Sequence, residues 1–538
     1  MNTKVLAVEL GLVRYRHDQP TTHLSPSSTV PHSQTWSLSQ DANKKSGICR
    51  VCFATRQLHN KDGTIHRHGP RDNPCTGSHQ LPLSDSVRSA NIGVRFDIPA
   101  TSLDSFSATS AAVSQAPVTS VLHEARHQSS SECMQHPVRS GSVLKRIPKN
   151  ARVHVGNLLL KLVNDILQHP SSITCWSRLF GFPYACLVKP QHGGKSRNLT
   201  SAIIKQVQQY EAGTELNPAV VSQSTRRAMR RGQSVKTPEQ HIAAAAATKL
   251  EDGDVRGAVR ILCSDDKLAV VNATTLNELS RLHPPAPLDR RFMPSTVASP
   301  LQVFPIAIKK AIQSFPNGSA GGPDGLRPQH LKDLLLGAPE DHPLLVAITG
   351  LTNLQLEGNT PPHVRSTLFG ATLLAIRKKT GGVRPIAVGY VWRRLTAKVA
   401  CCHVKEASAT ILAPRQLGFG IKGGAEAAVR AARRYVENMN QEQVFVKIDF
   451  KNAFNTLRRD SIIEAIALYF PELLAFTQST FGQDSVLQFG EFNLQSAEGA
   501  QQGDPLRPFY FCLAFKSLLE SLQSELVIGF LDDVALRR

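Results

Sequence analysis

Hydrophobic residues recur at helical spacing along several stretches of this chain. Between Val153 and Leu167 they fall on one face, which predicts an amphipathic helix. A helical hairpin is predicted over His241–Leu250 and Asp254–Cys263, with Asp254 as the N-cap of its second helix. Further helices are predicted over Phe304–Phe315, Trp392–Val404, Gly424–Met439 and Pro508–Leu526. In the last of these we expect five side chains to point inward: Phe511, Phe515, Leu518, Leu519 and Leu522.

Shorter apolar runs between turn residues predict strands. Thr372–Ile376 and Pro385–Val388 would form a hairpin, and Gln488–Gln495 would form one more strand. Val444–Ile448 is apolar except for Lys447, which predicts a central strand buried on both faces. Helices and strands mixed in this way predict the α+β class for residues 301–538.

Outside that part the composition changes several times along the chain. Residues 1–46 are polar and aperiodic and we expect disorder, while residues 81–143 are expected to be a linker. Residues 144–283 are predicted to be helical and basic, and the proline-rich residues 284–300 mark a boundary. Trp176, Phe180 and Phe182 could be a platform for stacked bases, but core packing is the favoured interpretation.

The chain is strongly basic. It has 62 Lys and Arg residues against 42 Asp and Glu residues, a formal charge of +20, which favours nucleic acid or an anionic membrane as partner. No apolar run reaches the roughly 20 residues that span a bilayer, so we expect no membrane partner. Ten cysteines in 538 residues suit a reducing compartment. We therefore expect an intracellular protein, in the nucleus or the cytoplasm.

Four arginines lie close together on one predicted helix face. They are Arg226, Arg227, Arg230 and Arg231. Such crowded like charges repel one another unless a polyanion neutralises them, which predicts nucleic-acid binding. A solvated face or a nuclear-import patch explains the same pattern, and the sequence leaves these readings open.

Carboxylates gather near the end of the sequence. Asp449 ends one predicted strand, and Asp532 and Asp533 lie side by side within another. Adjacent strand residues point to opposite faces, so both aspartates can serve one site only at a hairpin turn. Three clustered carboxylates repel one another unless cations fill the site. Two Mg²⁺ ions about 3.5–4 Å apart would suit the cluster and would support nucleotidyl transfer.

Five motifs in order resemble those of one family. Asp449-x4-Phe454, Gln502-Gly-Asp-Pro505 and Phe530-Leu-Asp-Asp533 resemble motifs A, B and C of reverse transcriptases. Upstream, Ala320-Gly-Gly-Pro-Asp-Gly325 and Gly381-Gly-Val-Arg-Pro-Ile386 resemble finger motifs of the non-LTR (LINE-like) retrotransposon branch. The resemblance implies an RNA-directed DNA polymerase with right-hand fingers and part of a palm in residues 301–538, without the thumb.

The resemblance also assigns roles to single residues. Asp449, Asp532 and Asp533 would be catalytic and would hold two Mg²⁺ ions. Arg384 with Lys378 or Lys379 would bind the triphosphate, and Phe454 would select the sugar. Gln502 and Gly503 would lie beside the nucleotide, while Asp504 would cap or orient the turn. RNA template, DNA primer and dNTPs are the implied partners.

Two positions depart from the family pattern, and one segment has two interpretations. Arg507 stands where most relatives have glycine, and Phe530 where many have tyrosine. Gln416–Gly424 resembles a template-contact segment, although a structural glycine loop would look the same.

The second function that we consider is a nucleic-acid-binding fragment without catalysis.

A zinc site is predicted near the start of the chain. Cys49 and Cys52 form a Cys-x2-Cys pair, and a tetrahedral Zn²⁺ needs two more ligands. Residues 47–80 resemble the C2HC fingers found ahead of some retroelement polymerases, which implies His68 and Cys75 as the remaining ligands. His66 is the first alternative, followed by His59 and His79.

Overall fold

A computed structural model describes most of the chain from residue 141 onward. The described residues are 8–13, 46–48, 55–57, 134, 136–137, 141–189, 198–213, 238–251, 253–264, 266–290, 298–379, 381–440 and 442–537. The chain forms two compact units, one of residues 1–16 and 117–538 and one of residues 17–116. Within the smaller unit the described elements are strands β2 (Ser46–Ile48) and β3 (Thr55–Gln57), which pair antiparallel.

From residue 141 onward, the larger unit begins with helices rich in apolar residues. Helix α2 (Arg152–Gln168) follows the 3-10 turn η1 (Lys149–Ala151) and packs against α3 (Ile173–Cys186), α4 (Leu199–Glu211) and α11 (Pro343–Leu356). This confirms the helix predicted between Val153 and Leu167. Trp176, Phe180 and Phe182 are buried at about 1% exposure or less. They are therefore core residues, as the favoured interpretation of that cluster predicted.

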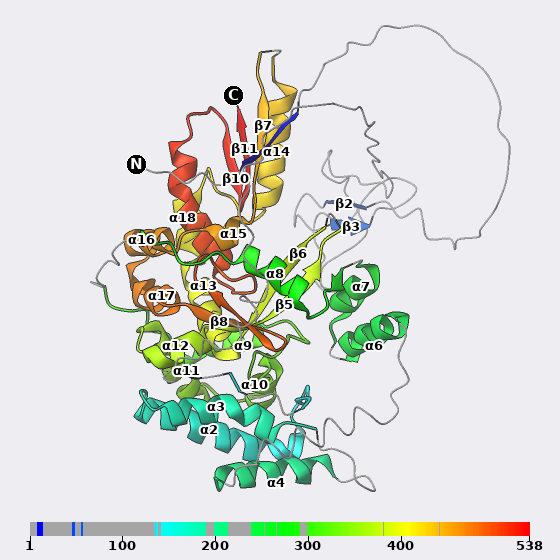
Figure 1. Ribbon diagram of the computed structural model, residues 1–538, viewed down its shortest axis with the longest axis vertical. Coiled ribbons are helices and arrows are strands. Elements are labelled where there is room, and N and C mark those ends of the chain that lie inside the picture. The colour runs from blue at the N-terminus through cyan, green and yellow to red at the C-terminus, as the bar shows by residue number, and fades with distance from the viewer. Residues whose placement is uncertain are drawn as a thin grey trace, which may run out of the picture. The chain divides into compact units, whose positions relative to one another are not determined.

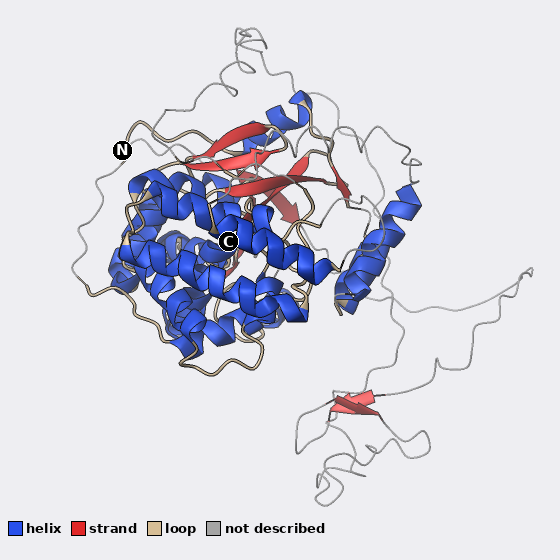
Figure 2. Ribbon diagram, turned by 90° about the horizontal axis from the view of Figure 1, so that it is seen from below, coloured by secondary structure: helices blue, strands red, loops and turns tan. Residues whose placement is uncertain are grey.

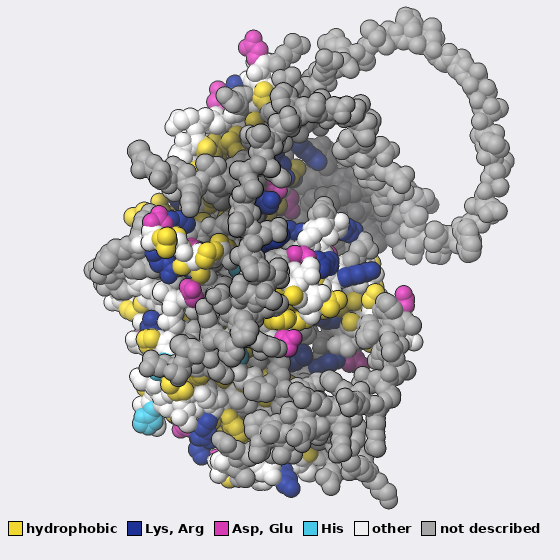
Figure 3. Space-filling model, in the orientation of Figure 1, with side chains coloured by type: hydrophobic (Ala, Val, Ile, Leu, Met, Phe, Trp, Pro, Cys, Tyr) yellow, Lys and Arg dark blue, Asp and Glu magenta, His cyan; other side chains and the backbone are white. Residues whose placement is uncertain are grey.

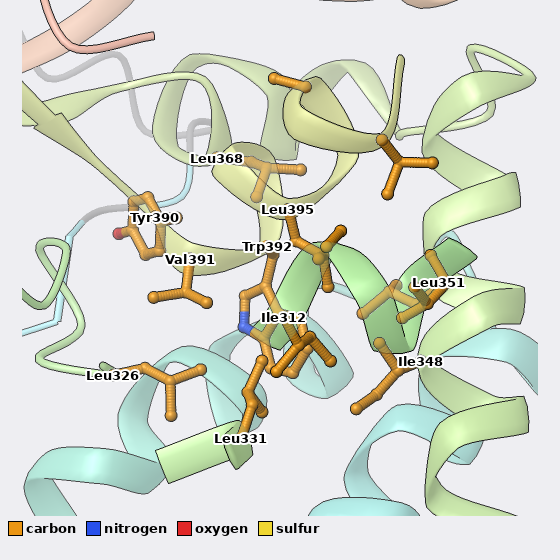
Figure 4. Packing of buried hydrophobic residues seen from close by; sticks show 14 of the residues in the cluster. Ile312, Leu326, Leu331, Ile348, Leu351, Leu368, Tyr390, Val391, Trp392 and Leu395 are labelled. Carbon is orange, nitrogen blue, oxygen red and sulfur yellow. The ribbon is translucent and has the colours of Figure 1, made fainter. Parts of the chain in front are cut away.

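The main core continues through four helices: α9 (Pro305–Gln313), α10 (Pro328–Leu334), α12 (Pro362–Leu368) and α13 (Val391–Leu412). Figure 4 shows Trp392 of α13 among Ile312, Leu331 and Leu395. Within the larger unit, most helices gather on one side of the strands (Figure 2). Helix α13 is longer than its predicted span because Lys405–Leu412 continue the same buried stripe.

The predicted helical hairpin is confirmed as α6 (Pro238–Glu251) and α7 (Val255–Cys263). Asp254 caps α7, since its Oδ1 accepts a hydrogen bond of 2.9 Å from the Gly257 amide. Helix α7 exposes Val255, Val259 and Leu262. Hydrophobic and basic side chains lie side by side on the face over α7 in Figure 3.

One sheet has the strand order β4-β5-β8-β9, with β6 also paired to β5. Its strands are β4 (Lys267–Leu268), β5 (Ala371–Arg377), β6 (Val383–Gly389), β8 (Ser485–Phe489) and β9 (Phe492–Ser496), and α8 (Ala273–Leu282) packs beside β6. The single strand predicted over Gln488–Gln495 is therefore wrong. Gly490 has a positive φ of 60°, which turns the chain back and makes a hairpin of β8 and β9.

The second sheet has the order β1-β7-β11-β10, with every neighbouring pair antiparallel. Its strands are β1 (Val8–Val13), β7 (Phe445–Phe450), β10 (Val527–Phe530) and β11 (Asp533–Arg537). Figure 1 shows β7, β11 and β10 near helices α14 (Gly424–Glu437) and α18 (Arg507–Ser521). Strand β7 lies inside the sheet, but the prediction that both its faces are buried is wrong. Lys447 and Asp449 are exposed on one face, because only the other face packs on the core.

Helix α18 ends at Ser521, five residues before the predicted end. Phe511, Phe515 and Leu519 are buried, whereas Leu518 is 37% exposed, so its predicted inward direction is wrong. The remaining elements are α15 (Ala453–Thr456), α16 (Arg459–Tyr469), η2 (Pro471–Leu473) and α17 (Leu474–Phe481). Among the described residues, no helix combines the length and apolar character needed to cross a bilayer.

Candidate active site

A tight hairpin carries the adjacent aspartates. Strands β10 and β11 pair as far as Phe530 opposite Asp533, which leaves Leu531 and Asp532 as a two-residue turn. Leu531 has a φ of 57°, a left-handed conformation that is uncommon for a residue with a branched side chain. The predicted hairpin turn at the two aspartates is therefore confirmed, with Asp532 in the turn and Asp533 at the start of β11.

Strand β7 brings the third aspartate to this hairpin. Asp449 is the direct partner of Asp533 in the antiparallel register, so both residues lie on the same face of the sheet. Lys447 is two residues before Asp449 and shares that face. Its Nζ forms an ion pair of 3.0 Å with Oδ1 of Asp533, whose side chain is 53% exposed.

Asp532 lies in a less solvated environment than its neighbour. Burial raises the pKa of its carboxyl group, and the negative charges of Asp533 and Asp449 raise this pKa further. The positive charge of Arg507 acts in the opposite direction. The three predicted carboxylates therefore lie within electrostatic reach of one another.

The donor set suits hard cations, but the side chains do not converge on one point. Carboxylate oxygens are the ligands that Mg²⁺ favours in proteins. Within the described part of the chain, no three His, Cys, Asp or Glu side chains are placed to hold a metal ion together. Oδ1 of Asp533 is paired with Lys447, so this lysine competes with a metal ion for that oxygen.

A buried glutamine, which sequence reasoning did not single out, fixes the hairpin turn. Gln416 is 0% exposed. Its Oε1 accepts a 2.9 Å hydrogen bond from the Leu531 amide, and its Nε2 donates a 3.1 Å bond to the Leu531 carbonyl. The backbone of β10 is held at the same place, because Gly529 donates to the Arg415 carbonyl and accepts from the Leu417 amide. The segment that begins at Gln416 thus supports the hairpin from within the protein.

A second buried network orients the turn from Gln501 to Leu506. Asp504 Oδ1 accepts from the Leu506 amide at 2.9 Å, and its Oδ2 pairs with Arg393 at 2.5 Å. Arg393 is 3% exposed and also donates to Gln501 Oε1 at 2.6 Å. Asp504 therefore caps and orients the turn, as predicted, and Arg393 anchors it to helix α13.

Gln502 and Gly503 contact strand β6 through their backbones. The Ala387 amide donates to the Gln502 carbonyl at 2.7 Å. Gly503 has a φ of 134°, and a Cβ atom there would lie 2.1 Å from the Ala387 carbonyl oxygen. Glycine is therefore required at this position for the turn to pack on β6. Contacts of these two residues with a nucleotide stay a prediction.

This geometry lies within a segment that matches a known family. Residues 376–537 match the model of the family described as "Reverse transcriptase (RNA-dependent DNA polymerase)". They form a reverse transcriptase domain. No protein among the curated ones matches the chain. The match includes the hairpin turn, Asp449, the turn at Gly503 and the β6 strand that follows Gly382.

Within the reverse transcriptase domain, Phe454 lies in the first turn of α15 and is half-buried. The ring of Phe511 lies 4.4 Å from it, centroid to centroid, and the guanidinium carbon of Arg507 lies 3.6 Å from the Phe454 centroid. In the sequence, Arg507 stands out only as a departure from the reverse transcriptase motif. Its position beside Asp532 and Phe454 brings it into the candidate site.

The three cations predicted to bind triphosphate lie on one hairpin of the reverse transcriptase domain. Arg384 is exposed on β6, opposite Ile376 of β5. Lys378 and Lys379 are exposed in the turn, where the Lys378 amide donates to the Gly382 carbonyl. Arg377, at the end of β5, forms an ion pair of 2.9 Å with Glu278 of α8, which ties the hairpin to that helix.

The other predicted site residues lie outside the described part of the chain. These are the zinc ligands Cys49, Cys52, His68 and Cys75 and the arginines Arg226, Arg227, Arg230 and Arg231. Sequence reasoning also missed Lys447, Arg393 and Gln416 as site residues. The sequence offers a weak signal for two of them. Lys447 lies two residues before Asp449, and Gln416 lies in a glycine-rich segment.

Proposed function

We propose that this chain is an RNA-directed DNA polymerase of the non-LTR retrotransposon type, which extends a DNA primer on an RNA template. One observation carries the proposal. Asp449 and Asp533 are paired across two strands, beside a turn that holds Asp532, and all three lie in the segment that matches the reverse transcriptase family.

In this proposal the three aspartates would hold two Mg²⁺ ions. Bound there, the ions would lower the pKa of the primer 3′-hydroxyl and stabilise the charge on the transferred phosphate. The chain's own residues supply position: Gln416 holds the turn, while Arg384 and a lysine of the β5–β6 turn would bind the triphosphate. The hydroxyl would attack the α-phosphate and release pyrophosphate.

The proposal also extends to the segments on which no contact is described. The finger of Cys49, Cys52, His68 and Cys75 would bind Zn²⁺, and the arginines from Arg226 to Arg231 would contact nucleic acid. A zinc content of one ion per chain, lost when Cys49 and Cys52 are both replaced by serine, is expected by metal analysis. An unchanged zinc content would contradict the assignment of these ligands.

The Lys447–Asp533 ion pair favours a second candidate, nucleic-acid binding without catalysis. A lysine beside a carboxylate competes with a metal ion for it, and among the described residues no three ligating side chains are placed to hold a metal ion. In this candidate the basic chain would bind nucleic acid in a salt-dependent way but would not transfer nucleotides.

Primer extension separates the two candidates. The full chain would be incubated with an oligo(dT) primer on poly(rA), dTTP and Mg²⁺. We expect extension by the wild type and by Asp341→Asn, an exposed control, and its loss in Asp449→Asn. Retained, salt-sensitive binding of the primer–template without extension by any variant would favour the binding protein.

A further inference from the structure

Two side chains of α18 pack on the ring of Phe454. The guanidinium carbon of Arg507 lies 3.6 Å from the ring centroid, and the ring of Phe511 lies 4.4 Å from it, centroid to centroid. The two aromatic rings are inclined by 35°. Phe454 is therefore held by both side chains, and the guanidinium of Arg507 lies over its ring as a cation–π contact.

Arg507 lies over this ring and within electrostatic reach of Asp532 in the β10–β11 turn. It is the first residue of α18, directly after the turn that Asp504 and Arg393 orient. The positive charge of Arg507 acts to lower the pKa of Asp532. The negative charge of Asp532 acts in turn to raise the pKa of Arg507, against the effect of burial. Burial lowers the pKa of Arg507 to about 10, so the guanidinium stays protonated at neutral pH.

The hydrogen-bonding capacity of Arg507 is not filled by the protein around it. Among the residues that the structure describes, the buried Nε of Arg507 has no hydrogen-bond partner. A guanidinium carries five N–H donors in one plane, and stacking on a ring leaves the edge of that plane free. A buried N–H donor without an acceptor costs free energy unless a ligand accepts its hydrogen bond.

We propose that Arg507 is a nucleotide-binding residue, whose guanidinium is held flat on Phe454 and donates hydrogen bonds to the α-phosphate of the incoming nucleoside triphosphate. The inference rests on the proposed function, because it places the reacting phosphate at Asp532. An anion suits the position, since a guanidinium and a phosphate form paired, charge-assisted hydrogen bonds. Phe454 and Phe511 would act as the support that keeps the guanidinium in place.

The expected effect is a loss of nucleotide affinity. A hydrogen bond to a charged group is typically worth about a 10- to 100-fold change in a dissociation constant. Arg507→Met keeps much of the packing but removes the charge, so the Kd for dTTP should rise by about that factor. Arg507→Lys keeps the charge without the planar fork, and its Kd should lie between those of the wild type and Arg507→Met.

The test is equilibrium binding of dTTP and of thymidine to the full chain, with primer–template and Ca²⁺ present. Arg178→Met is the matched control, because Arg178 also lies over a ring, that of Tyr210 at 5.9 Å, in helix α3. We expect weaker dTTP binding in Arg507→Met, with thymidine binding unchanged and the Arg178→Met variant like the wild type. Equal dTTP affinity in the wild type and Arg507→Met would overturn the proposal, as would a wild type that binds no dTTP.

The same experiment separates this inference from the proposed polymerase activity. If the wild type binds dTTP through Arg507 but extends no primer, catalysis fails while the binding role stands. If the wild type extends primers and Arg507→Lys and Arg507→Met both bind dTTP normally, the polymerase stands and the role of Arg507 is wrong. Melting temperatures of all variants show whether each is folded.

Discussion

Gln416 makes two hydrogen bonds with Leu531, one to its amide and one to its carbonyl. The two residues are 115 positions apart, and Leu531 is the left-handed residue of the turn that carries Asp532. A backbone conformation that costs free energy persists when neighbouring groups hold it. The carboxamide of Gln416 is such a group, and it ties the turn to the segment after α13.

Replacement of Gln416 should slow catalysis more than it weakens substrate binding. Gln416→Ala removes both bonds, and Gln416→Glu keeps an acceptor for the Leu531 amide but no donor for its carbonyl. Small displacements of catalytic groups cost up to about 100-fold in rate, so we expect kcat to fall about 10- to 100-fold in Gln416→Ala and less in Gln416→Glu. The KM for dTTP should change little.

Steady-state single-nucleotide incorporation measures both constants. Gln313→Ala, at an exposed position of α9, is the control for loss of a glutamine side chain. If Gln416→Ala is folded and has the kcat of the wild type, the positioning role of Gln416 is wrong.

The buried Arg393–Asp504 pair should be strongly coupled. Removal of one partner leaves an uncompensated buried charge, which typically costs about 3–5 kcal/mol. We expect Arg393→Met and Asp504→Leu each to lower the free energy of unfolding by about this amount. The double variant should be less destabilised than the sum of the two. Urea unfolding of the four proteins gives the coupling energy, and simple additivity would show that the pair acts as two independent groups.

Gly503 should tolerate no side chain. A Cβ atom at this residue would meet the Ala387 carbonyl, and its φ is unfavourable for other residues. Gly337 is a matched control, since its φ of 74° is also positive but nothing lies within 4 Å of an added Cβ. We expect Gly337→Ala to cost about 1 kcal/mol of strain and Gly503→Ala about 1–3 kcal/mol more. Equal melting temperatures for the two variants would contradict this packing.

Asp324 should make stability depend on pH. The residue is fully buried, and burial raises the pKa of its carboxyl group to about 8. The unfolded chain ionises this group near its ordinary value of 3.8, whereas the folded chain keeps it protonated. The contribution of Asp324 to the free energy of unfolding is therefore fully present below pH 3.8, and it is lost as the pH rises toward 8.

Comparison with Asp324→Asn isolates this group. Between about pH 5 and pH 8, the wild type should lose up to about 1.4 kcal/mol per pH unit relative to Asp324→Asn. Above pH 8 the difference in free energy of unfolding between the two proteins should stay constant. Urea unfolding at several pH values tests this, and a constant difference between the two proteins would mean that Asp324 does not titrate in this range.

Local patterns were sufficient for most of the elements and for the acidic hairpin. Helix α2 and the β10–β11 turn follow from spacing alone, because periodicity and adjacent aspartates are local signals. The two-faced burial of β7 and the single strand over Gln488–Gln495 were wrong. An apolar run does not reveal which face another element covers, and the turn at Gly490 interrupts a pattern that looks continuous.

The supporting contacts could not be predicted, because they join distant parts of the chain. Gln416 and Leu531 lie 115 positions apart, and Arg393 and Asp504 lie 111 apart. In the sequence, Lys447 is only an interruption of an apolar run, although the pairing of β7 with β11 places it beside Asp533. The position of Arg507 over Phe454 depends on how α18 packs against α15, which no local pattern contains.

Single-turnover incorporation of one radiolabelled dTMP measures whether the hairpin aspartates support nucleotide transfer. The full chain, a primed poly(rA) template and Mg²⁺ would be mixed with the labelled dTTP, and both primer and pyrophosphate would be measured. We expect one pyrophosphate released for each dTMP added by the wild type, and no transfer by the Asp532→Asn/Asp533→Asn variant. Equal transfer by the two proteins, or no transfer by a folded wild type that binds its substrates, would contradict this expectation.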